Sequence, residues 1–322
     1  MQKVLVIGGA GFIGSFIARA LVERKIDVTI FDSFYQYLPK LVPDENKILA
    51  QENRFKDIEG KIKVIRGNAA NYGEVRRAIE EQDPDCIIHL AGLPLANKSN
   101  IYIEESLEGV KATGCILQVI KDTGKKIKFI YTSSSTVYGD FVYQPADEDH
   151  PKNPRGVYAG VKLAGEHITS SFCRQFNISY VIIRPSGVYG PTDINERVVQ
   201  KFIENAIEGK EIVVKDPTNM IDFTYVKDLA EGYALAVIKE EANNETFNIT
   251  CGQGRTLGEL AEIIKKHFPK TKLKIDEADK DLPRRGGLSI ERAKKKLGYV
   301  PKYPLEKGIE EYIVYYKRNV RK

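Results

Sequence analysis

A short apolar run followed by three regularly spaced glycines constrains the fold of this chain more than any other feature. Val4–Ile7 reads as a strand, and Gly8, Gly11 and Gly14 follow it in a G-x-x-G-x-x-G turn. Gly8 permits the tight turn, Gly11 lets a pyrophosphate approach bare backbone, and Gly14 lets the next helix pack closely on the sheet. Phe12–Ile13 opens that helix, so the phosphates would face its positive N-terminus. The turn therefore predicts a dinucleotide-binding unit.

An acidic residue after the second predicted strand indicates which dinucleotide is bound. The strand is Val28–Phe31, and Asp32 follows it directly. A carboxylate at this place accepts hydrogen bonds from both ribose hydroxyls and repels a 2′-phosphate. We therefore expect the cofactor to be NAD rather than NADP.

Strand and helix patterns alternate through residues 1–185. The predicted strands are Val4–Ile7, Val28–Phe31, Lys63–Arg66, Cys86–Leu90, Lys128–Thr132 and Tyr180–Ile183. Helical patterns such as Tyr72–Glu81 and Ser106–Thr123 lie between them, and Asp44–Ile58 reads as an added surface helix. This alternation is typical of an α/β fold, a Rossmann-like doubly wound parallel sheet with helices on both faces.

The character of the chain changes after Pro185. The later segments are predicted to be mixed, with helices near 198–208, 228–240, 257–268 and 305–317 and a strand at 211–214. We expect a NAD-binding Rossmann domain at 1–185 and a smaller mixed α/β substrate-binding domain at 186–322, with a strand near 246–250 returning to the sheet. Ligands bind beyond the carboxyl ends of such strands, so the second domain should close over that edge.

Composition argues against several other classes of protein. No apolar run in the 322 residues approaches the roughly 20 needed to cross a bilayer, and the N-terminus leaves no room for a signal peptide. The four cysteines and four histidines are scattered, so we expect a reduced, cytoplasmic protein without metal or membrane association. The net charge of +5 comes without a basic-aromatic motif, which favours an anionic small substrate over nucleic acid.

Tyr158 and Lys162 form the candidate catalytic pair. Residues four apart on a helix share one face. Of the 17 tyrosines only Tyr158 and Tyr303 have Lys four residues on, and Pro304 makes the second a poor setting for a helix. A nearby ammonium favours the ionised phenol, which can take a hydroxyl proton while NAD accepts hydride from the same carbon. The alternative is a surface contact without a catalytic role.

Small hydroxyl residues follow the strand at 128–132, at the edge where the cofactor is expected. Ser134, Ser135 and Thr136 belong to this run. Their hydroxyls can bond a substrate hydroxyl and stabilise charge on its oxygen during hydride transfer. A turn of helix-capping serines without any chemistry is the alternative.

Together these residues resemble the extended short-chain dehydrogenase/reductase family, within it the nucleotide-sugar epimerase/dehydratase branch. The resemblance covers essentially the whole chain. It rests on Gly8–Gly14, Asp32, His89–Gly92, Ser133–Gly139, Tyr158, Lys162, Arg184–Pro185, Gly190–Pro191, Asp222–Asp228 and Leu297–Tyr299.

The resemblance implies a role for each site residue. Ser134 matches the serine that bonds the reacting hydroxyl, Tyr158 the base, and Lys162 the ribose-binding partner, while Thr136 is also placed to touch the sugar. Cofactor contacts beyond the glycine turn and Asp32 are expected from Asn68, Leu90, Ala91, Gly92 and Pro185. The resemblance also implies a homodimer through the helices predicted at 106–123 and 158–176.

The residues before Val137 narrow the reaction. Similar 4,6-dehydratases carry an Asp-Glu pair there and similar decarboxylases keep the Glu, whereas this chain has Ser135 and Thr136. Neither is a general acid or base at neutral pH. The resemblance thus implies an NAD-dependent epimerase of a nucleotide-diphosphate sugar that inverts position 4 through a keto intermediate, as UDP-hexose and UDP-uronate 4-epimerases do. The alternatives are a nucleotide-sugar oxidoreductase or dehydratase with net chemistry, and a non-catalytic cofactor sensor, which has no need of a base.

Two phosphate contacts common in similar epimerases are missing. Gly187 stands where many have Asn, and Ile221 where many have Arg. Arg197, Arg284 and Arg285 are candidates to replace them, because a bidentate guanidinium suits a diphosphate. For the last two a solvated loop is an equal alternative. The small Gly187 would also leave room for a sugar to turn within the site.

Overall fold

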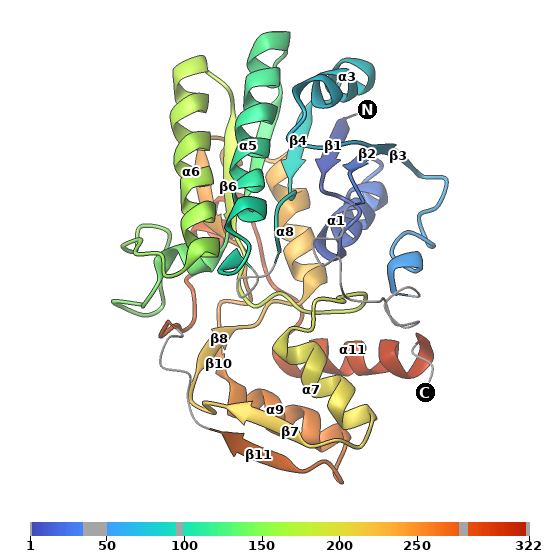
Figure 1. Ribbon diagram of the computed structural model, residues 1–322, viewed down its shortest axis with the longest axis vertical. Helices are drawn as coiled ribbons and strands as arrows, with labels where there is room; N and C mark the ends of the chain where they lie inside the picture. The colour runs from blue at the N-terminus through green and yellow to red at the C-terminus, as the bar shows by residue number, and fades with distance from the viewer. Residues whose placement is uncertain (1, 35–49, 95–98, 277–282, 320–322) are drawn as a thin grey trace.

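The chain folds around one seven-stranded parallel sheet with the strand order β3-β2-β1-β4-β5-β6-β9 (Figure 1). The computed structural model describes residues 2–34, 50–94, 99–276 and 283–319. The strands are β1 (Lys3–Ile7), β2 (Asp27–Asp32), β3 (Ile62–Arg66), β4 (Cys86–His89), β5 (Lys128–Thr132), β6 (Tyr180–Arg184) and β9 (Glu245–Asn248). The predicted Rossmann-like sheet is confirmed. The strand order reverses between β1 and β4, which is where such sheets leave a ligand crevice.

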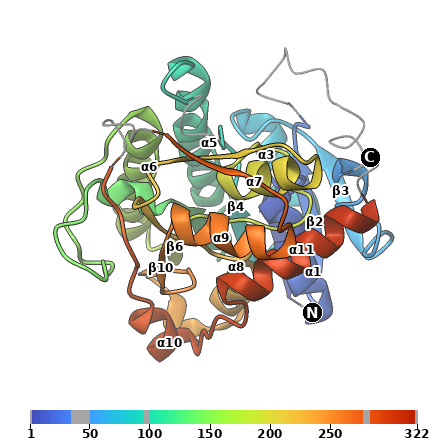
Figure 2. The same cartoon turned by 90° about the horizontal axis from the view of Figure 1, so that it is seen from below.

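Helices cover both faces of the sheet, which explains why its inner strands read as apolar runs. Val4, Leu5, Val6 and Ile7 of β1 are each at most 1% exposed, although alternate side chains point to opposite faces. One face is covered by α1 (Phe12–Glu23) and α8 (Val226–Ile238), and the other by α3 (Tyr72–Gln82), α5 (Ile103–Thr123) and α6 (Val157–Phe176) (Figures 1 and 2).

The second half of the chain returns to the sheet. β9 pairs in parallel with β6, with Arg184 opposite Asn248, and α8 packs against α1. The short helix α10 (Glu291–Leu297) also contacts β9. Residues 226–250 thus add a helix and a strand to the sheet side of the molecule. The division of the chain at residues 185 and 186 stays a prediction.

A smaller lobe lies below the sheet in Figure 1 and has a core of its own. Its elements are α7 (Val198–Ile207), β7 (Ile212–Lys215), β8 (Met220–Asp222), β10 (Gly254–Thr256), α9 (Leu257–His267), β11 (Leu273–Asp276) and α11 (Leu305–Asn319). β7 pairs in parallel with β11, and β8 pairs antiparallel with β10. A capping box starts α9, because Thr256 and Glu259 each accept the other's backbone N–H.

Several sequence predictions concern the surface of the molecule. Of the helix predicted at Asp44–Ile58, residues 44–49 lie outside the described residues, residues 50–52 are helical, and turns follow.

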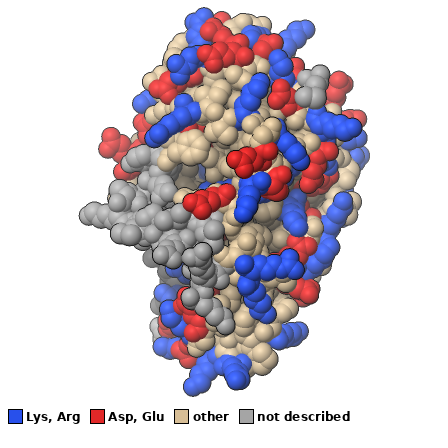
Figure 3. All heavy atoms as spheres, turned by 90° about the vertical axis from the view of Figure 1, so that its right-hand side faces the viewer, with Lys and Arg blue, Asp and Glu red and all other residues tan. Residues whose placement is uncertain are grey.

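α5 and α6 lie side by side on one face of the sheet, and a homodimer through them stays a prediction. On the face in Figure 3, Lys and Arg side chains alternate with Asp and Glu. Within the described ranges, no helix is long and apolar enough to cross a membrane.

Gly165 lets α6 touch β5, and its replacement gives a test of this contact. A Cβ at Gly165 would lie 2.0 Å from the hydroxyl oxygen of the buried Tyr131. We expect Gly165→Ala to lower the free energy of unfolding by about 1–3 kcal/mol, because the rigid ring must move. Gly160→Ala is the matched control, since the same helix leaves open space there and Ala stabilises helices by up to about 1 kcal/mol. Denaturant unfolding that ranks both variants equally would contradict the expectation.

Candidate active site

The glycine turn is closed toward the sheet and open where the cofactor is expected. An added Cβ at Gly8, whose φ is +78°, would lie 2.5 Å from the Ala91 nitrogen, and one at Gly14 would lie 2.4 Å from the Gly9 oxygen. A Cβ added at Gly11 would lie 3.7 Å from its nearest neighbour, the Gly8 oxygen, so space remains beside the Gly11 backbone. The first N–H groups of α1 have no partners within the helix. The turn therefore fits a pyrophosphate.

Asp32 lies at the end of β2, beside this turn. Its Oδ2 accepts the Ala10 N–H at 2.9 Å and its Oδ1 accepts the Phe34 N–H at 2.8 Å. Each oxygen keeps a second lone pair that can accept a ribose hydroxyl. Asn68 is exposed after β3, and its amide oxygen already accepts the Ala70 N–H, so its NH₂ group is what it can offer to an adenine.

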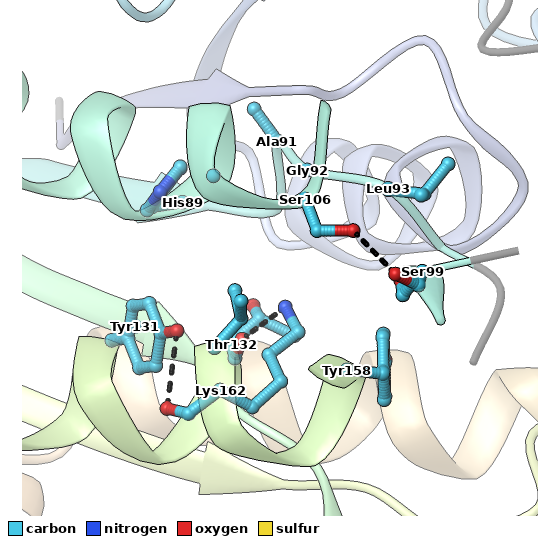
Figure 4. Close-up of a pocket in the computed structure, with 12 residues that line it drawn as sticks. His89, Ala91, Gly92, Leu93, Ser99, Ser106, Tyr131, Thr132, Tyr158 and Lys162 are labelled. Atoms are coloured by element: carbon cyan, nitrogen blue, oxygen red, sulfur yellow. Dashed lines mark hydrogen bonds between the residues drawn. The ribbon is translucent and has the colours of Figure 1, made fainter. Parts of the chain in front are cut away.

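The other predicted cofactor residues lie at the ends of β4 and β6. The Leu90 N–H donates to the Ile7 oxygen at 2.8 Å, which continues the ladder between β4 and β1. The Pro185 oxygen accepts the Ser135 N–H at 2.9 Å. Ala91 and Gly92 line a small cavity, which the close-up shows (Figure 4). Its lining also includes His89, Leu93, Ser99, Ser106, Tyr131, Thr132, Tyr158 and Lys162.

Tyr158 and Lys162 rise from the first turns of α6 toward this cavity (Figure 4). Lys162 Nζ donates to the Thr132 oxygen at 2.9 Å and lies 5.8 Å from the centre of the Tyr158 ring. The Ser134 side chain hydrogen-bonds Tyr158. The three predicted catalytic residues are therefore brought together from two separate segments of the chain.

Burial controls the protonation of this pair. It raises the pKa of Tyr158 above its ordinary value, while the charge of Arg197 and the hydrogen bond with Ser134 act in the opposite direction. It lowers the pKa of Lys162 to about 8. The expectation that the phenol pKa is lowered is therefore wrong, because the loss of hydration outweighs the nearby charges.

The serine run forms a short loop in which Ser134 caps a turn of 3₁₀ helix, η1 (Ser135–Tyr138). Ser134 Oγ accepts the Thr136 N–H at 3.2 Å and the Thr136 hydroxyl at 3.0 Å. Ser135 is 1% exposed, so its hydroxyl is enclosed by protein. Of the three predicted substrate hydroxyls, those of Ser134 and Thr136 are the better placed.

A buried ion pair holds this loop against α6. Arg184 donates to both oxygens of Glu166 at 2.8 and 2.7 Å, and the two side chains are 3% and 6% exposed. Ser133 Oγ donates to Glu166 Oε1 at 2.5 Å, and Arg184 Nη1 donates to the Tyr138 hydroxyl at 2.9 Å. Sequence reasoning missed this network, although Glu166 continues the four-residue spacing of Tyr158 and Lys162.

Gly187 and Ile221, which replace the two phosphate-contacting residues of similar epimerases, lie next to each other. Gly187 has φ +47°, and a Cβ on it would lie 2.7 Å from Ile221 Cγ2 and 2.7 Å from the Asp222 oxygen. A larger residue at position 187 would therefore be strained and would collide with Ile221. Glycine here is required by both the backbone and the neighbouring side chain.

The three candidate arginines are placed differently. Arg197 donates to the buried Asp193 at 2.9 Å, and its charge reaches Tyr158. The Arg284 side chain is exposed, and its backbone N–H donates to Asp140 at 2.6 Å. Arg285 is half-buried, burial lowers its pKa, and its Nε has no hydrogen-bond partner among the described residues. The geometry thus favours Arg285 over the predicted Arg284 for an anionic ligand.

Comparison with known proteins gives the family. The sequence matches the model of the NAD dependent epimerase/dehydratase family over residues 4–250. The chain belongs to this family.

Individual members of the epimerase/dehydratase family match over nearly the full length. UDP-glucose 4-epimerase of Thermotoga maritima, solved with UDP-glucose, is 26% identical, covers 99% of this chain and 100% of its own, and has a TM-score of 0.87. UDP-glucuronic acid 4-epimerase of Bacillus cereus, solved with UDP-glucuronic acid and NAD, is 26% identical with coverage of 98% and 99% and a TM-score of 0.87. Mouse dTDP-D-glucose 4,6-dehydratase is 28% identical, with coverage of 99% and 89%.

Membership in the epimerase/dehydratase family confirms the predicted resemblance and the predicted cofactor, NAD. Relatives include both epimerases and dehydratases, so the family assigns an NAD-dependent enzyme of nucleotide sugars without choosing between these reactions. Among the described residues, no group of three or more His, Cys, Asp or Glu side chains could hold a metal ion. Arg54, Glu166 and Asp193 are buried charged residues that the sequence analysis did not single out.

The lowered pKa of Lys162 predicts how stability depends on pH. In the folded protein its pKa is about 8, against 10.5 as its ordinary value, so the unfolded chain binds more protons between these pH values. Stability contributed by Lys162 therefore rises as the pH increases through this window, by at most about 1.4 kcal/mol per unit. Lys162→Met removes this titration. Denaturant unfolding at pH 7.5 and 10 should show the native protein gaining relative to the variant, and a constant difference would contradict the prediction.

Proposed function

We propose that this member of the family is a 4-epimerase of a nucleoside-diphosphate sugar. The observation that carries the proposal is the loop beside Tyr158, where Ser134, Ser135 and Thr136 supply hydroxyls and no carboxylate. Glu166, on the same helix face, has both oxygens engaged by Arg184. One base and neutral hydroxyls suit an oxidation and its reversal at one carbon, whereas elimination of water needs further acid and base groups.

Tyr158 and Ser134 act on the reacting hydroxyl, and Lys162 supports them. Tyr158 takes the hydroxyl proton and returns it, and Ser134 donates to the oxygen as charge develops there. Lys162 binds the cofactor ribose and, while protonated, favours the phenolate. When bound, NAD would supply reversible hydride acceptance at the sugar carbon. Return to the opposite face of the flat keto sugar inverts the centre.

Inversion also requires a firmly held nucleotide and a loosely held sugar. Arg285 is the candidate for the diphosphate, because its half-buried guanidinium carries an Nε without a partner among the described residues. Arg197 reaches the site from the start of α7 and offers a second positive charge. Gly187 contributes no side chain that would restrain the sugar. The two solved epimerases with UDP-sugars support this substrate class.

The reaction is tested by supplying UDP-glucose, UDP-glucuronate and their N-acetyl counterparts in deuterated water and following the sugars by NMR. We expect an inverted sugar with no deuterium at position 4, without added NAD, because the hydride returns internally. A dehydrated product would favour the second candidate, a 4,6-dehydratase, which the mouse relative supports. NADH that accumulates with substrate would favour a net oxidoreductase. Either result would contradict the epimerase proposal.

Tyr158→Phe tests the base and removes only a hydroxyl. We expect turnover to fall by roughly 10²–10⁴, the usual contribution of general acid–base catalysis, while NAD binding persists. Tyr303→Phe is the control, since Tyr303 also precedes a lysine by four residues but packs against Tyr225 and Lys227 at the core of the smaller lobe. Retained turnover in Tyr158→Phe would remove this residue from the mechanism and would favour a non-catalytic role for the pair.

A further inference from the structure

One buried arginine joins the cofactor turn to the lobe below the sheet. Arg54 is 7% exposed and lies in the turns that follow residues 50–52. Its Nη1 donates to the Ala10 oxygen at 3.1 Å, and its Nη2 donates to the Thr192 oxygen at 3.1 Å. Ala10 belongs to the glycine turn, and Thr192 precedes α7. The same guanidinium therefore bridges the backbone of the glycine turn and the backbone of the loop before α7.

The bond to Ala10 controls the direction of a peptide that faces the cofactor. In a planar trans peptide the C=O and the following N–H point in opposite directions. Because Arg54 holds the Ala10 C=O, the Gly11 N–H must point away from Arg54. Asp32 holds the preceding peptide through the Ala10 N–H at 2.9 Å. The central peptides of the turn are thus held from both sides, one by a cation and one by an anion.

The bond to Thr192 reaches the substrate side of the crevice. Thr192 has φ +68°, which is uncommon for a β-branched residue and requires support from its surroundings. The next residue, Asp193, is buried and accepts from Arg197 at 2.9 Å. Arg197 in turn acts on Tyr158 through its charge. Arg54 therefore supports the loop that carries Arg197, the arginine whose charge acts on the proposed base.

Arg54 is itself held in place through Nη1 and Nη2, while its Nε has no hydrogen-bond partner among the described residues. Arg19 of α1 donates to the Arg54 oxygen and forms an ion pair with Asp57 at 2.7 Å. Two carboxylates, Asp32 and Asp193, favour the charged guanidinium against the cost of burial. A buried arginine without such compensation would be strongly destabilising. The surrounding groups are therefore arranged to keep a cation between the cofactor turn and the substrate loop.

We propose that Arg54 is a positioning residue that locks the cofactor turn to the loop before α7 and so keeps NAD bound from one reaction cycle to the next. This inference deepens the proposed epimerase function, in which the same NAD must take up and return the hydride. The two bonds of Arg54 oppose any movement of the turn that would weaken its contacts with the NAD pyrophosphate.

The test measures NAD release without any sugar present. The protein is loaded with labelled NAD and chased with excess unlabelled NAD, and thermal unfolding of the cofactor-free protein is followed in parallel. We expect Arg54→Met to release NAD about 10-fold faster or more, because charge-assisted hydrogen bonds to the turn are lost. Arg54→Lys should give an intermediate rate, since an ammonium keeps the charge but lacks the planar fork that reaches both carbonyls.

Arg24→Met is the matched control. Arg24 also joins two elements, through bonds of 2.6 Å to Glu231 of α8, but does not contact the glycine turn. Its removal should leave NAD release unchanged even where it lowers thermal stability. If Arg54→Met does not fold, Arg54→Lys and Arg54→Gln provide the comparison. Native rates of NAD release in every folded Arg54 variant would overturn the inference. Because no sugar is used, that result would leave the epimerase proposal standing, and a failed epimerase assay would leave the release rates interpretable.

Discussion

The ion pair between Glu166 and Arg184 is the interaction on which the rest of the site depends. It joins α6, which carries Tyr158 and Lys162, to the end of β6 and, through Ser133, to the serine loop. A buried ion pair stabilises a protein only when its remaining polar atoms are also hydrogen-bonded, and here both partners have further bonds. Loss of one partner would leave the other charged and buried, so the geometry of the proposed catalytic residues and the stability of the fold are tied to the same contact.

The inner strands of the central sheet could be predicted from the sequence because β1, β2, β4, β5 and β6 are buried on both faces and therefore read as apolar runs, whereas the edge strand β3 is largely exposed. The strands β8, β10 and β11 of the lobe could not, since they have three or four residues each and several of these are partly exposed. Their pairing depends on contacts between distant segments. The contact between Arg54 and Ala10 could not be predicted either, because the two residues lie 44 positions apart and no local sequence pattern joins them.

Within the site, residues that follow a local spacing were identified and residues defined by burial were not. Tyr158, Lys162 and Ser134 follow motifs that can be read along the chain, and the structure brings their side chains together. The choice between Arg284 and Arg285 depends on which side chain the loop turns inward, and no local pattern records that. The protonation of Tyr158 likewise depends on how much water the folded protein removes, which the spacing to Lys162 does not reveal.

The contact between Gly187 and Ile221 has a consequence for how the substrate side of this enzyme can change. Because a Cβ at position 187 would collide with Ile221, replacing the glycine alone introduces both backbone strain and a clash. Replacing Ile221 alone relieves that contact but leaves the left-handed backbone at Gly187. The two positions are therefore expected to be epistatic, so that a route toward a polar phosphate contact passes through a less stable single variant unless position 221 changes first.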